Sequence, residues 1–292
     1  MNGADGRGRS FLYVPGHRRE RIHRAVGSDA DAVVIDLEDA VPAAAKGSAR
    51  DTVRAVLDAG AAGPVWVRVD GTDPEPDIAT VVAPSLTGIW VPKAEPGLLG
   101  RIDALLAAAE RDRGLPPGGV AVVALIETAA GVLHAEQVAR SPRVVRLGVG
   151  EADLAGELRL RPDDERTELF GIRLQLVLAS AAAGLGAPIG PVETNVSDQD
   201  LLVRTTRTLL RQGFRGRTAL HPRQLATINA VFTPTPAEVA AATELLADFA
   251  TGNANGDAAL VDRHGRFVDP AVLRTARETI ARATQNPRVQ RS

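Results

Sequence analysis

Two apolar runs near the middle of the chain each lead to a carboxylate, and this pair is the clearest candidate for chemistry. The run Ala-Val-Val-Ala-Leu-Ile ends at Glu127, and the run Val-Val-Arg-Leu-Gly-Val leads through Gly150 and Glu151 to Asp153. Short apolar runs bounded by turn residues are typical of buried parallel strands, whose carboxyl ends face the ligand crevice of an α/β fold. Two carboxylates held there predict a site for a hard divalent cation.

Mg²⁺ suits these residues better than Zn²⁺. The chain contains no Cys and only five His, so thiolate zinc sites, disulfides and thiol nucleophiles are excluded. A Mg²⁺ site takes one or two carboxylates, and water and substrate oxygens complete its octahedron. We therefore predict Glu127 and Asp153 as the metal ligands. The alternative is that each acid caps the following helix or pairs with a nearby arginine.

The elements that must position these acids alternate regularly along the chain. Strands are predicted at residues 11–14, 32–37, 65–69, 88–91, in the runs before Glu127 and Glu151, and at residues 187–190 and 217–220. Helices are predicted between them, at residues 17–26, 43–59, 77–83, 98–111, 131–140, 165–183 and 198–212, with another from Pro222 to about residue 231. Eight strand–helix units predict a (β/α)8 barrel. An open doubly wound sheet is the alternative, although no G-x-G-x-x-G follows the first strand.

Composition agrees with this fold and excludes several classes of protein. Of 292 residues, 45% are hydrophobic and only 3% aromatic, so the core depends on Val, Leu, Ile and Ala, as in parallel α/β sheets. The net charge of −2, with no basic stripe, argues against nucleic-acid binding. No apolar window is long enough to span a membrane. The lack of Cys is compatible with a reducing compartment, and we expect a cytoplasmic protein.

The chain is expected to have three parts: a disordered tail at residues 1–9, the barrel at residues 10–235, and an extension at residues 236–292. In the extension we predict a helix at residues 237–250, a Gly- and Asn-rich hinge at 251–257, a hairpin turning near 262–265, and a last helix at 270–283. A hinge followed by a compact element is typical of a lid. The alternative is an appendage that packs on the outside of the barrel.

Further charged side chains gather at the predicted carboxyl ends of the strands, whereas the opposite ends are mostly Ala, Gly and Pro. Arg68 offers a planar fork for a carboxylate or a developing oxyanion, and the alternative is an ion pair with Asp70 or Glu38. Asp36 is placed to hold a metal-bound water. His221, before a proline, is interpreted as a helix cap.

The predicted helix at residues 17–26 is basic, and its arginines either meet phosphates of a nucleotide-like substrate arm or form a solvated face. Lys93, after the fourth strand, either contacts substrate or pairs with Glu95 or Glu127. Six residues are therefore candidates for contact with the substrate: Arg18, Asp36, Glu38, Arg68, Lys93 and Glu127.

Eight short motifs in order resemble the citrate lyase β-subunit-like enzymes of the HpcH/HpaI aldolase superfamily. They are LYVPGHR (residues 12–18), DLEDAV (36–41), VRV (67–69), VPKAE (91–95), IET (126–128), GVGEADL (148–154), LHPRQ (220–224) and, in the extension, GRFVD (265–269). The resemblance extends from about residue 11 to residue 231 and touches the tail. The pyruvate aldolases of the sister branch carry a His after the second strand, where this chain has Asp36-Leu-Glu-Asp39.

The resemblance implies a Mg²⁺-dependent barrel that cleaves a carbon–carbon bond in a 3-hydroxy-acyl-CoA thioester of the malyl-CoA or citramalyl-CoA type. It implies that Glu127 and Asp153 bind the metal and that Arg68 holds the thioester oxygen as it becomes an enolate. Asp269 would be an acid–base group, in relatives often delivered by the lid of a neighbouring subunit, which implies a homotrimer or hexamer. The partners would be a CoA thioester and a small 2-oxo acid. The alternatives are a citrate lyase β subunit acting on an acyl-carrier-protein thioester, and a non-enzymatic barrel that binds a CoA ester.

Overall fold

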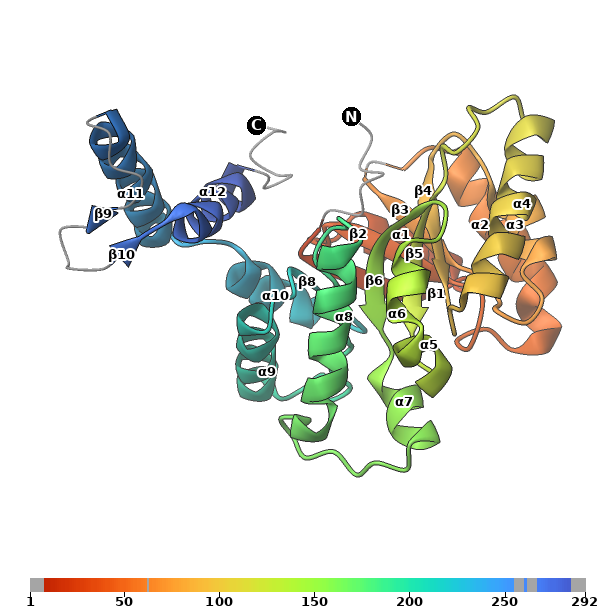
Figure 1. The fold of residues 1–292 in the computed structure, drawn as a ribbon. Coiled ribbons are helices and arrows are strands. Elements are labelled where there is room, and N and C mark those ends of the chain that lie inside the picture. The colour runs from red at the N-terminus through yellow and green to blue at the C-terminus, as the bar shows by residue number, and fades with distance from the viewer. Residues whose placement is uncertain (1–7, 62, 255–259, 262–266, 285–292) are drawn as a thin grey trace. The chain divides into compact units, whose positions relative to one another are not determined.

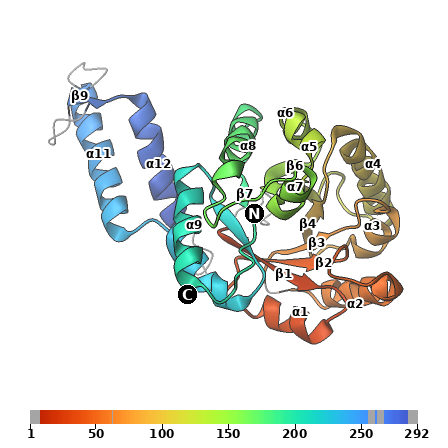
Figure 2. The ribbon, with the colours of Figure 1, turned by 90° about the horizontal axis from the view of Figure 1, so that it is seen from below.

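Eight parallel strands follow one another in sequence order and close into a barrel, in which β1 pairs with both β2 and β8. The computed structural model describes residues 8–61, 63–254, 260–261 and 267–284. Figure 1 shows the strands with their connecting helices, and Figure 2 shows the helices outside the ring. The predicted (β/α)8 fold is therefore confirmed. Contacts divide the chain into two compact units, residues 1–229 and 230–292.

The strands are short and apolar because helices cover the outside of the wall while side chains fill its inside. Phe11, Trp66 and Trp90 are almost completely buried in one cluster of the barrel. The strands are β1 (Ser10–Pro15), β2 (Ala32–Asp36), β3 (Val65–Arg68), β4 (Leu86–Val91), β5 (Ala121–Ile126), β6 (Val144–Val149), β7 (Ile189–Gly190) and β8 (Gly216–Ala219). The filled interior leaves the strand ends as the place for a site.

Most helices lie where the sequence predicts them, and several begin at a recognisable cap. The Thr128 hydroxyl accepts a hydrogen bond from the Gly131 amide, and Asp198 accepts one from the Leu201 amide. The helices of the barrel are α1 (Arg19–Val26), α2 (Lys46–Asp58), α3 (Glu75–Val81), α4 (Pro96–Asp112), α5 (Ala129–Leu133), α6 (Ala135–Ala139), α7 (Glu151–Glu157), α8 (Phe170–Ala182), α9 (Gln199–Arg211) and α10 (Leu225–Phe232). None of the helices in the described part of the chain is long and apolar enough to cross a membrane.

Four elements differ from the prediction. Strand β7 has two residues rather than four, because Pro188 and Pro191 flank it and proline donates no ladder hydrogen bond. The helix expected at residues 131–140 is broken at His134 into α5 and α6. The helix expected from residue 165 begins at Phe170, after a single 3-10 turn. Helix α7, which directly follows Gly150, was not predicted.

The second unit contains α11 (Pro236–Ala254), β9 (Leu260–Val261), β10 (Phe267–Val268) and α12 (Pro270–Thr284). Helix α11 packs along α12, as Figures 1 and 2 both show. Strands β9 and β10 pair antiparallel, which confirms the predicted hairpin, although its turn lies outside the described residues. Helix α11 continues four residues into the predicted hinge, whose remaining residues also lie outside the described part.

The predicted tail falls mostly outside the described residues, but its last residues contact the barrel. The Arg9 side chain pairs with Asp31 through two hydrogen bonds of 2.8 and 2.7 Å, and its backbone amide donates to the same carboxylate. The Gly8 carbonyl accepts a hydrogen bond from buried Arg146. Gly8 and Arg9 therefore belong structurally to the barrel.

Candidate active site

A cavity of ≈ 690 Å³ lies within the barrel unit at the carboxyl ends of the strands. Every strand contributes at least one residue to its lining: Tyr13, Asp36, Arg68, Trp90, Leu125, Val149, Ile189 and Thr218, in strand order. Glu127 and Asp153 line it too, just beyond β5 and β6. The cavity is thus at the rim where barrel folds place their ligands.

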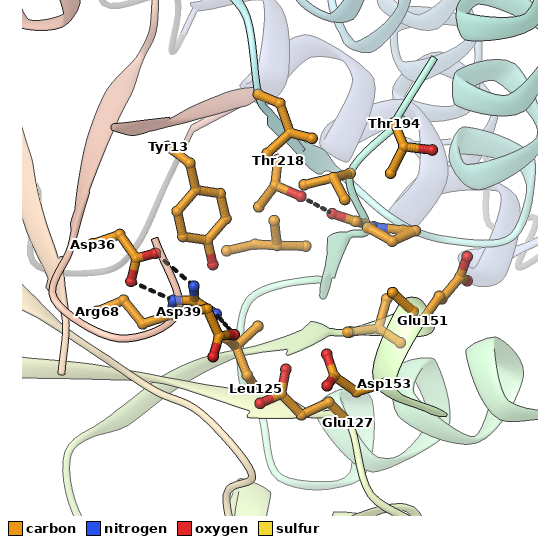
Figure 3. A pocket seen from close by; sticks show the side chains of 18 of the residues that line it. Tyr13, Asp36, Asp39, Arg68, Leu125, Glu127, Glu151, Asp153, Thr194 and Thr218 are labelled. Atoms are coloured by element: carbon orange, nitrogen blue, oxygen red, sulfur yellow. Dashed lines mark hydrogen bonds and ion pairs between the residues drawn. The ribbon is translucent and has the colours of Figure 1, made fainter. Parts of the chain in front are cut away.

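The structure brings Glu127 and Asp153 together, although 26 positions separate them in the sequence. Figure 3 shows their carboxylates side by side, turned into the pocket. Glu127 is almost fully buried, and its Oε1 accepts a hydrogen bond of 2.9 Å from the Lys93 backbone amide. Asp153, in the first turn of α7, is exposed to the cavity. The two acids therefore offer oxygens to one point, Glu127 from the end of β5 and Asp153 from the first turn of α7.

The electrostatics of this pair fit a hard cation. Burial raises the pKa of Glu127 to about 7, and the Asp153 carboxylate contributes to the rise by repulsion. A divalent cation between two such carboxylates would relieve that repulsion. In the described part of the chain, no group of three or more His, Cys, Asp or Glu is arranged to cage a metal. A two-carboxylate site of this kind suits Mg²⁺, which keeps several water or substrate ligands.

Arg68 lies beside the acid pair, held by the carboxylate that ends the neighbouring strand. Its Nε and Nη2 donate to the two oxygens of Asp36 at 2.7 and 2.6 Å, and β2 and β3 pair these two residues directly. The Asp36 oxygens also accept the backbone amides of Glu38 and Ala40. Because each Asp36 oxygen already accepts two hydrogen bonds, Asp36 is built to orient the guanidinium.

A second acid, Glu38, completes the surroundings of Arg68. Its Oε2 lies 2.8 Å from Arg68 Nη1, and burial raises the pKa of Glu38 to about 7. The ion pair with Glu38 that the sequence left as an alternative for Arg68 is therefore present. Asp70, the other suggested partner, pairs with Lys46 instead. The guanidinium also lies over the Tyr13 ring, 5.3 Å from its centre, which fixes its plane.

The remaining predicted residues lie in different places. Lys93 contributes its backbone amide to Glu127, and its backbone has a left-handed φ of 46°. Arg18 directly precedes α1, whereas Arg21 of that helix lines the cavity. His221 accepts a hydrogen bond from the Arg223 amide, which confirms its interpretation as a cap. Asp269 belongs to the second unit, where its carboxylate caps α12 through the Ala271 and Val272 amides.

Comparison with known proteins identifies the family. Residues 9–222, about three-quarters of the chain, match the sequence model of the HpcH/HpaI aldolase/citrate lyase family. This chain belongs to that family. It is accordingly an enzyme of the aldolase and lyase type.

Relatives in the HpcH/HpaI family match over almost the whole chain. A (3S)-malyl-CoA thioesterase of Cereibacter sphaeroides is 36% identical over 283 residues, covering 94% of both chains. A citrate lyase subunit beta of Leuconostoc mesenteroides is 31% identical over 278 residues, covering 92% of this chain and 91% of the relative. Among solved structures, CitE of Mycobacterium tuberculosis in complex with magnesium, acetoacetate and coenzyme A has a TM-score of 0.76 at 25% identity. It covers 96% of this chain and 100% of its own.

Sequence reasoning missed a group of buried charges on the β6–β8 side of the pocket. Arg173 and Arg166 pair with Glu151, and Arg166 and Arg217 pair with Glu193. The partners come from α7, α8, two loops and β8, so spacing along the chain carries no signal for them. Arginines within helix α8 and strand β8, which otherwise read as apolar, were the available sign. Of these residues, only Glu151 comes just after one of the two apolar runs that lead to the predicted metal ligands, and the sequence predicts no role for it.

The raised pKa of Glu127 predicts an unusual effect on stability. In metal-free buffer, Glu127→Gln is expected to gain stability relative to wild type as the pH rises from 4.5 to 8, by up to about 3 kcal/mol. The folded wild type holds a proton on Glu127 up to about pH 7, whereas the unfolded chain releases it near pH 4.5. Ionisation therefore destabilises the folded wild type over this range, and Gln keeps the neutral form. Urea unfolding of both proteins with EDTA at each pH measures the difference.

The matched control is Glu110→Gln, in the last turn of α4, where Glu110 accepts the backbone amides that precede β5. Burial alone would raise the pKa of Glu110, but hydrogen bonds from Arg143 and from the Val120 and Gly118 amides lower it. Glu110 thus stabilises the fold when ionised, and its replacement is expected to destabilise the protein at pH 8 by about 3–5 kcal/mol. A stability difference for Glu127→Gln that stays constant from pH 4.5 to 8 would contradict the raised pKa.

Proposed function

We propose that the protein is a Mg²⁺-dependent carbon–carbon lyase that cleaves a 3-hydroxy-acyl-CoA thioester of the malyl-CoA or citramalyl-CoA type. The products are a 2-oxo acid and an acyl-CoA, formed through an enolate. The observation that carries the proposal is the placement of Arg68 beside the paired carboxylates of Glu127 and Asp153 in one pocket. The enzyme class follows from the family, and the substrate class is our inference.

Glu127 and Asp153 would hold the Mg²⁺, with the remaining positions open to water and substrate oxygens. When bound, Mg²⁺ supplies positive charge that polarises the oxygens of the 2-oxo acid half. Solved relatives support this choice of cation, since a citrate lyase beta subunit from M. tuberculosis has been solved in complex with oxaloacetate and magnesium. That structure is 26% identical, has a TM-score of 0.64, and covers 80% of this chain and all of its own.

Arg68 would stabilise the thioester oxygen. Breaking the bond between C2 and C3 leaves the electron pair on the acyl-CoA fragment as an enolate, while the 3-hydroxyl loses its proton to become the carbonyl. The negative charge therefore grows on an oxygen that needs a pre-oriented cation. Asp36, Glu38 and the Tyr13 ring hold the guanidinium in one orientation before substrate arrives. Such pre-organisation avoids reorganisation during the reaction.

Asp269 is our candidate for the acid–base group. The enolate carbon must gain a proton in cleavage and lose one in the reverse condensation. Asp269 keeps its carboxylate in the first turn of α12, directly after the short hairpin of the second unit. Its delivery to a pocket as part of a lid, from the same or a neighbouring subunit, remains part of the proposal, as do the homotrimer or hexamer and the cytoplasmic location.

The CoA arm would meet the basic helix α1. Arg21 lines the cavity, and Arg18 precedes the first residue of the helix. A CoA thioester carries phosphates that arginine side chains bind well. The M. tuberculosis complex that contains coenzyme A supports a CoA-type ligand for this fold.

A second candidate is a citrate lyase β subunit acting on an acyl-carrier-protein thioester, which the Leuconostoc relative favours. The Cereibacter relatives favour a further step, hydrolysis of the thioester. One experiment distinguishes these functions. Purified protein with Mg²⁺ is incubated with malyl-CoA, citramalyl-CoA and methylmalyl-CoA, and glyoxylate, pyruvate and free CoA are quantified.

Release of a 2-oxo acid and an acyl-CoA supports the lyase, and free CoA without any oxo acid supports the thioesterase. Activity that appears only with an acyl-carrier protein and partner subunits supports the citrate lyase subunit. No product under any of these conditions would overturn the proposed substrate class.

A further inference from the structure

We propose that Glu151 is a positioning residue for the cation site. Its carboxylate, clamped between Arg173 and Arg166, fixes the first turn of α7 so that Asp153 faces Glu127. This inference rests on the proposed function of Glu127 and Asp153 as metal ligands. Glu151 itself acts through Asp153.

Helix α7 needs outside contacts to hold its orientation. It has only seven residues, and Gly150 before it provides no side-chain cap. Helices of this length are not stable by themselves, because their few hydrogen bonds do not offset nucleation. Leu154 is fully buried and anchors one face of the helix, while Asp153 is exposed to the cavity. A second anchor is required to set the rotation of the helix about Leu154.

Glu151, the first residue of α7, is that second anchor. Its Oε1 accepts Arg173 Nε at 2.5 Å, and its Oε2 accepts Arg173 Nη2 at 3.0 Å and Arg166 Nη1 at 3.2 Å. Glu151 is 4% exposed and the Arg173 side chain 3% exposed. A buried bidentate pair between a guanidinium and a carboxylate fixes both the distance between the two groups and the plane that they share. The carboxylate is thereby tied to α8, which extends along the barrel wall.

The ion pairs of Glu151 are connected to further buried charges near β7 and β8. Arg166 Nη2 lies 3.3 Å from Glu193, which also pairs with buried Arg217 at 3.3 Å. Arg217 in turn donates to the hydroxyls of Thr205 and Thr206 in α9. Because β7 has only two residues, few ladder hydrogen bonds connect β6 to β8. The chain of ion pairs supplies the connection on the side of the pocket that carries Asp153.

The start of α7 also lies directly against Glu127, so a small shift of the helix would change the acid pair. The Gly150 amide donates to the Ile126 carbonyl at 3.0 Å. A Cβ at Gly150 would lie 2.4 Å from Glu127 Oε2 and 2.6 Å from Glu127 Cβ, so only glycine fits. Because this backbone lies so close to Glu127, any rotation of α7 would change the positions of Glu127 and Asp153 relative to each other. Glu151 is therefore the side chain that sets the separation of Glu127 and Asp153.

Direct binding of Mn²⁺ to the purified full chain, followed by electron paramagnetic resonance, tests this role without turnover. Glu151→Gln is expected to weaken Mn²⁺ binding about 10- to 100-fold, as replacements of residues that orient metal ligands do. Arg166→Gln, which leaves the Arg173 pair intact, is expected to weaken it less. Glu110→Gln is the matched control: it removes another buried, arginine-paired acid, but one in the last turn of α4, next to the segment before β5.

The outcomes distinguish a role of Glu151 in positioning Asp153 from an effect on the stability of the whole protein. Weakened Mn²⁺ binding in Glu151→Gln and Arg166→Gln, with Glu110→Gln equal to wild type despite its lower melting temperature, supports the inference. Mn²⁺ binding by Glu151→Gln equal to wild type overturns it, and so does equal weakening in all three variants. If Glu151→Gln does not fold, Arg166→Gln decides alone, because Arg166 is partly exposed and its loss leaves Glu151 and Glu193 paired. Wild type that binds no Mn²⁺ would instead refute the proposed metal site.

Discussion

Glu127→Gln is expected to lower kcat in saturating Mg²⁺ by at least about 1,000-fold, because the charge that a bound metal supplies to the transition state is worth several kcal/mol. Gln can still accept the hydrogen bond from the Lys93 amide, so the local backbone should be preserved. What it loses is the negative charge shared with Asp153. Steady-state assays of oxo-acid release, combined with Mg²⁺ titration by calorimetry, would measure both consequences.

Asp153→Asn should have a similar effect, and the double variant should be little worse than either single one, because the two acids act on one ion. Asp163→Asn serves as the matched control. Asp163 lines the same cavity, but its carboxylate is occupied by the amide and hydroxyl of Thr167. Activity retained in Glu127→Gln, or lost equally in Asp163→Asn, would contradict the assignment of the metal ligands.

Arg68→Lys is expected to lower kcat by about 100- to 1,000-fold with a small change in KM, the range seen when one donor to a developing oxyanion is removed. Lysine keeps the positive charge but has no planar fork, so it cannot bind both Asp36 oxygens and still present a donor to the substrate. Measurement of kcat and KM separately is essential, since a residue that only binds substrate would raise KM instead.

Two further variants test whether the fall in kcat comes from the Arg68 guanidinium itself. Arg54→Lys, on the outer face of α2 where Arg54 pairs with Asp58, should leave both constants unchanged. Asp36→Asn keeps Arg68 but weakens its charged pairing, and it should lower kcat by a smaller factor than Arg68→Lys. An Arg68→Lys enzyme with wild-type kcat would exclude Arg68 from stabilising the enolate.

The structure also explains why the acids beside Arg68 contact it differently despite their similar positions in the sequence. Asp36 ends β2 directly opposite Arg68 in the sheet register, so its carboxylate meets the guanidinium face to face. Glu38 is two residues further, buried, and held near only one nitrogen. Asp39 is largely exposed and lies 3.5 Å away. These three acids, all within four positions, therefore differ in how closely they contact the Arg68 guanidinium.

The sequence alone determined the barrel and the location of its chemistry. Apolar runs of strand length, separated by helices, have few compact solutions, and eight of them in parallel close into a barrel. Because all carboxyl ends of parallel strands meet at one rim, Glu127, Asp153, Arg68 and Asp36 were predictable as neighbours. Periodicity and turn residues are local signals, and strands β1–β6 lie close to where these signals predict them.

Only the tertiary structure decided which charges pair and how the rim is held. The sequence suggested Asp70 or Glu38 as the partner of Arg68. Strand register instead places Asp36 directly beside Arg68, with Glu38 as a second partner, whereas Asp70 pairs with Lys46. Arg173 and Glu151 meet across an unpredicted helix and a long loop. Pairing of this kind depends on where α7 and α8 pack, and not on how far apart the residues are in the sequence. Burial makes it costly to leave any of these charges unpaired, and burial is a property of the folded chain that no single stretch of residues carries.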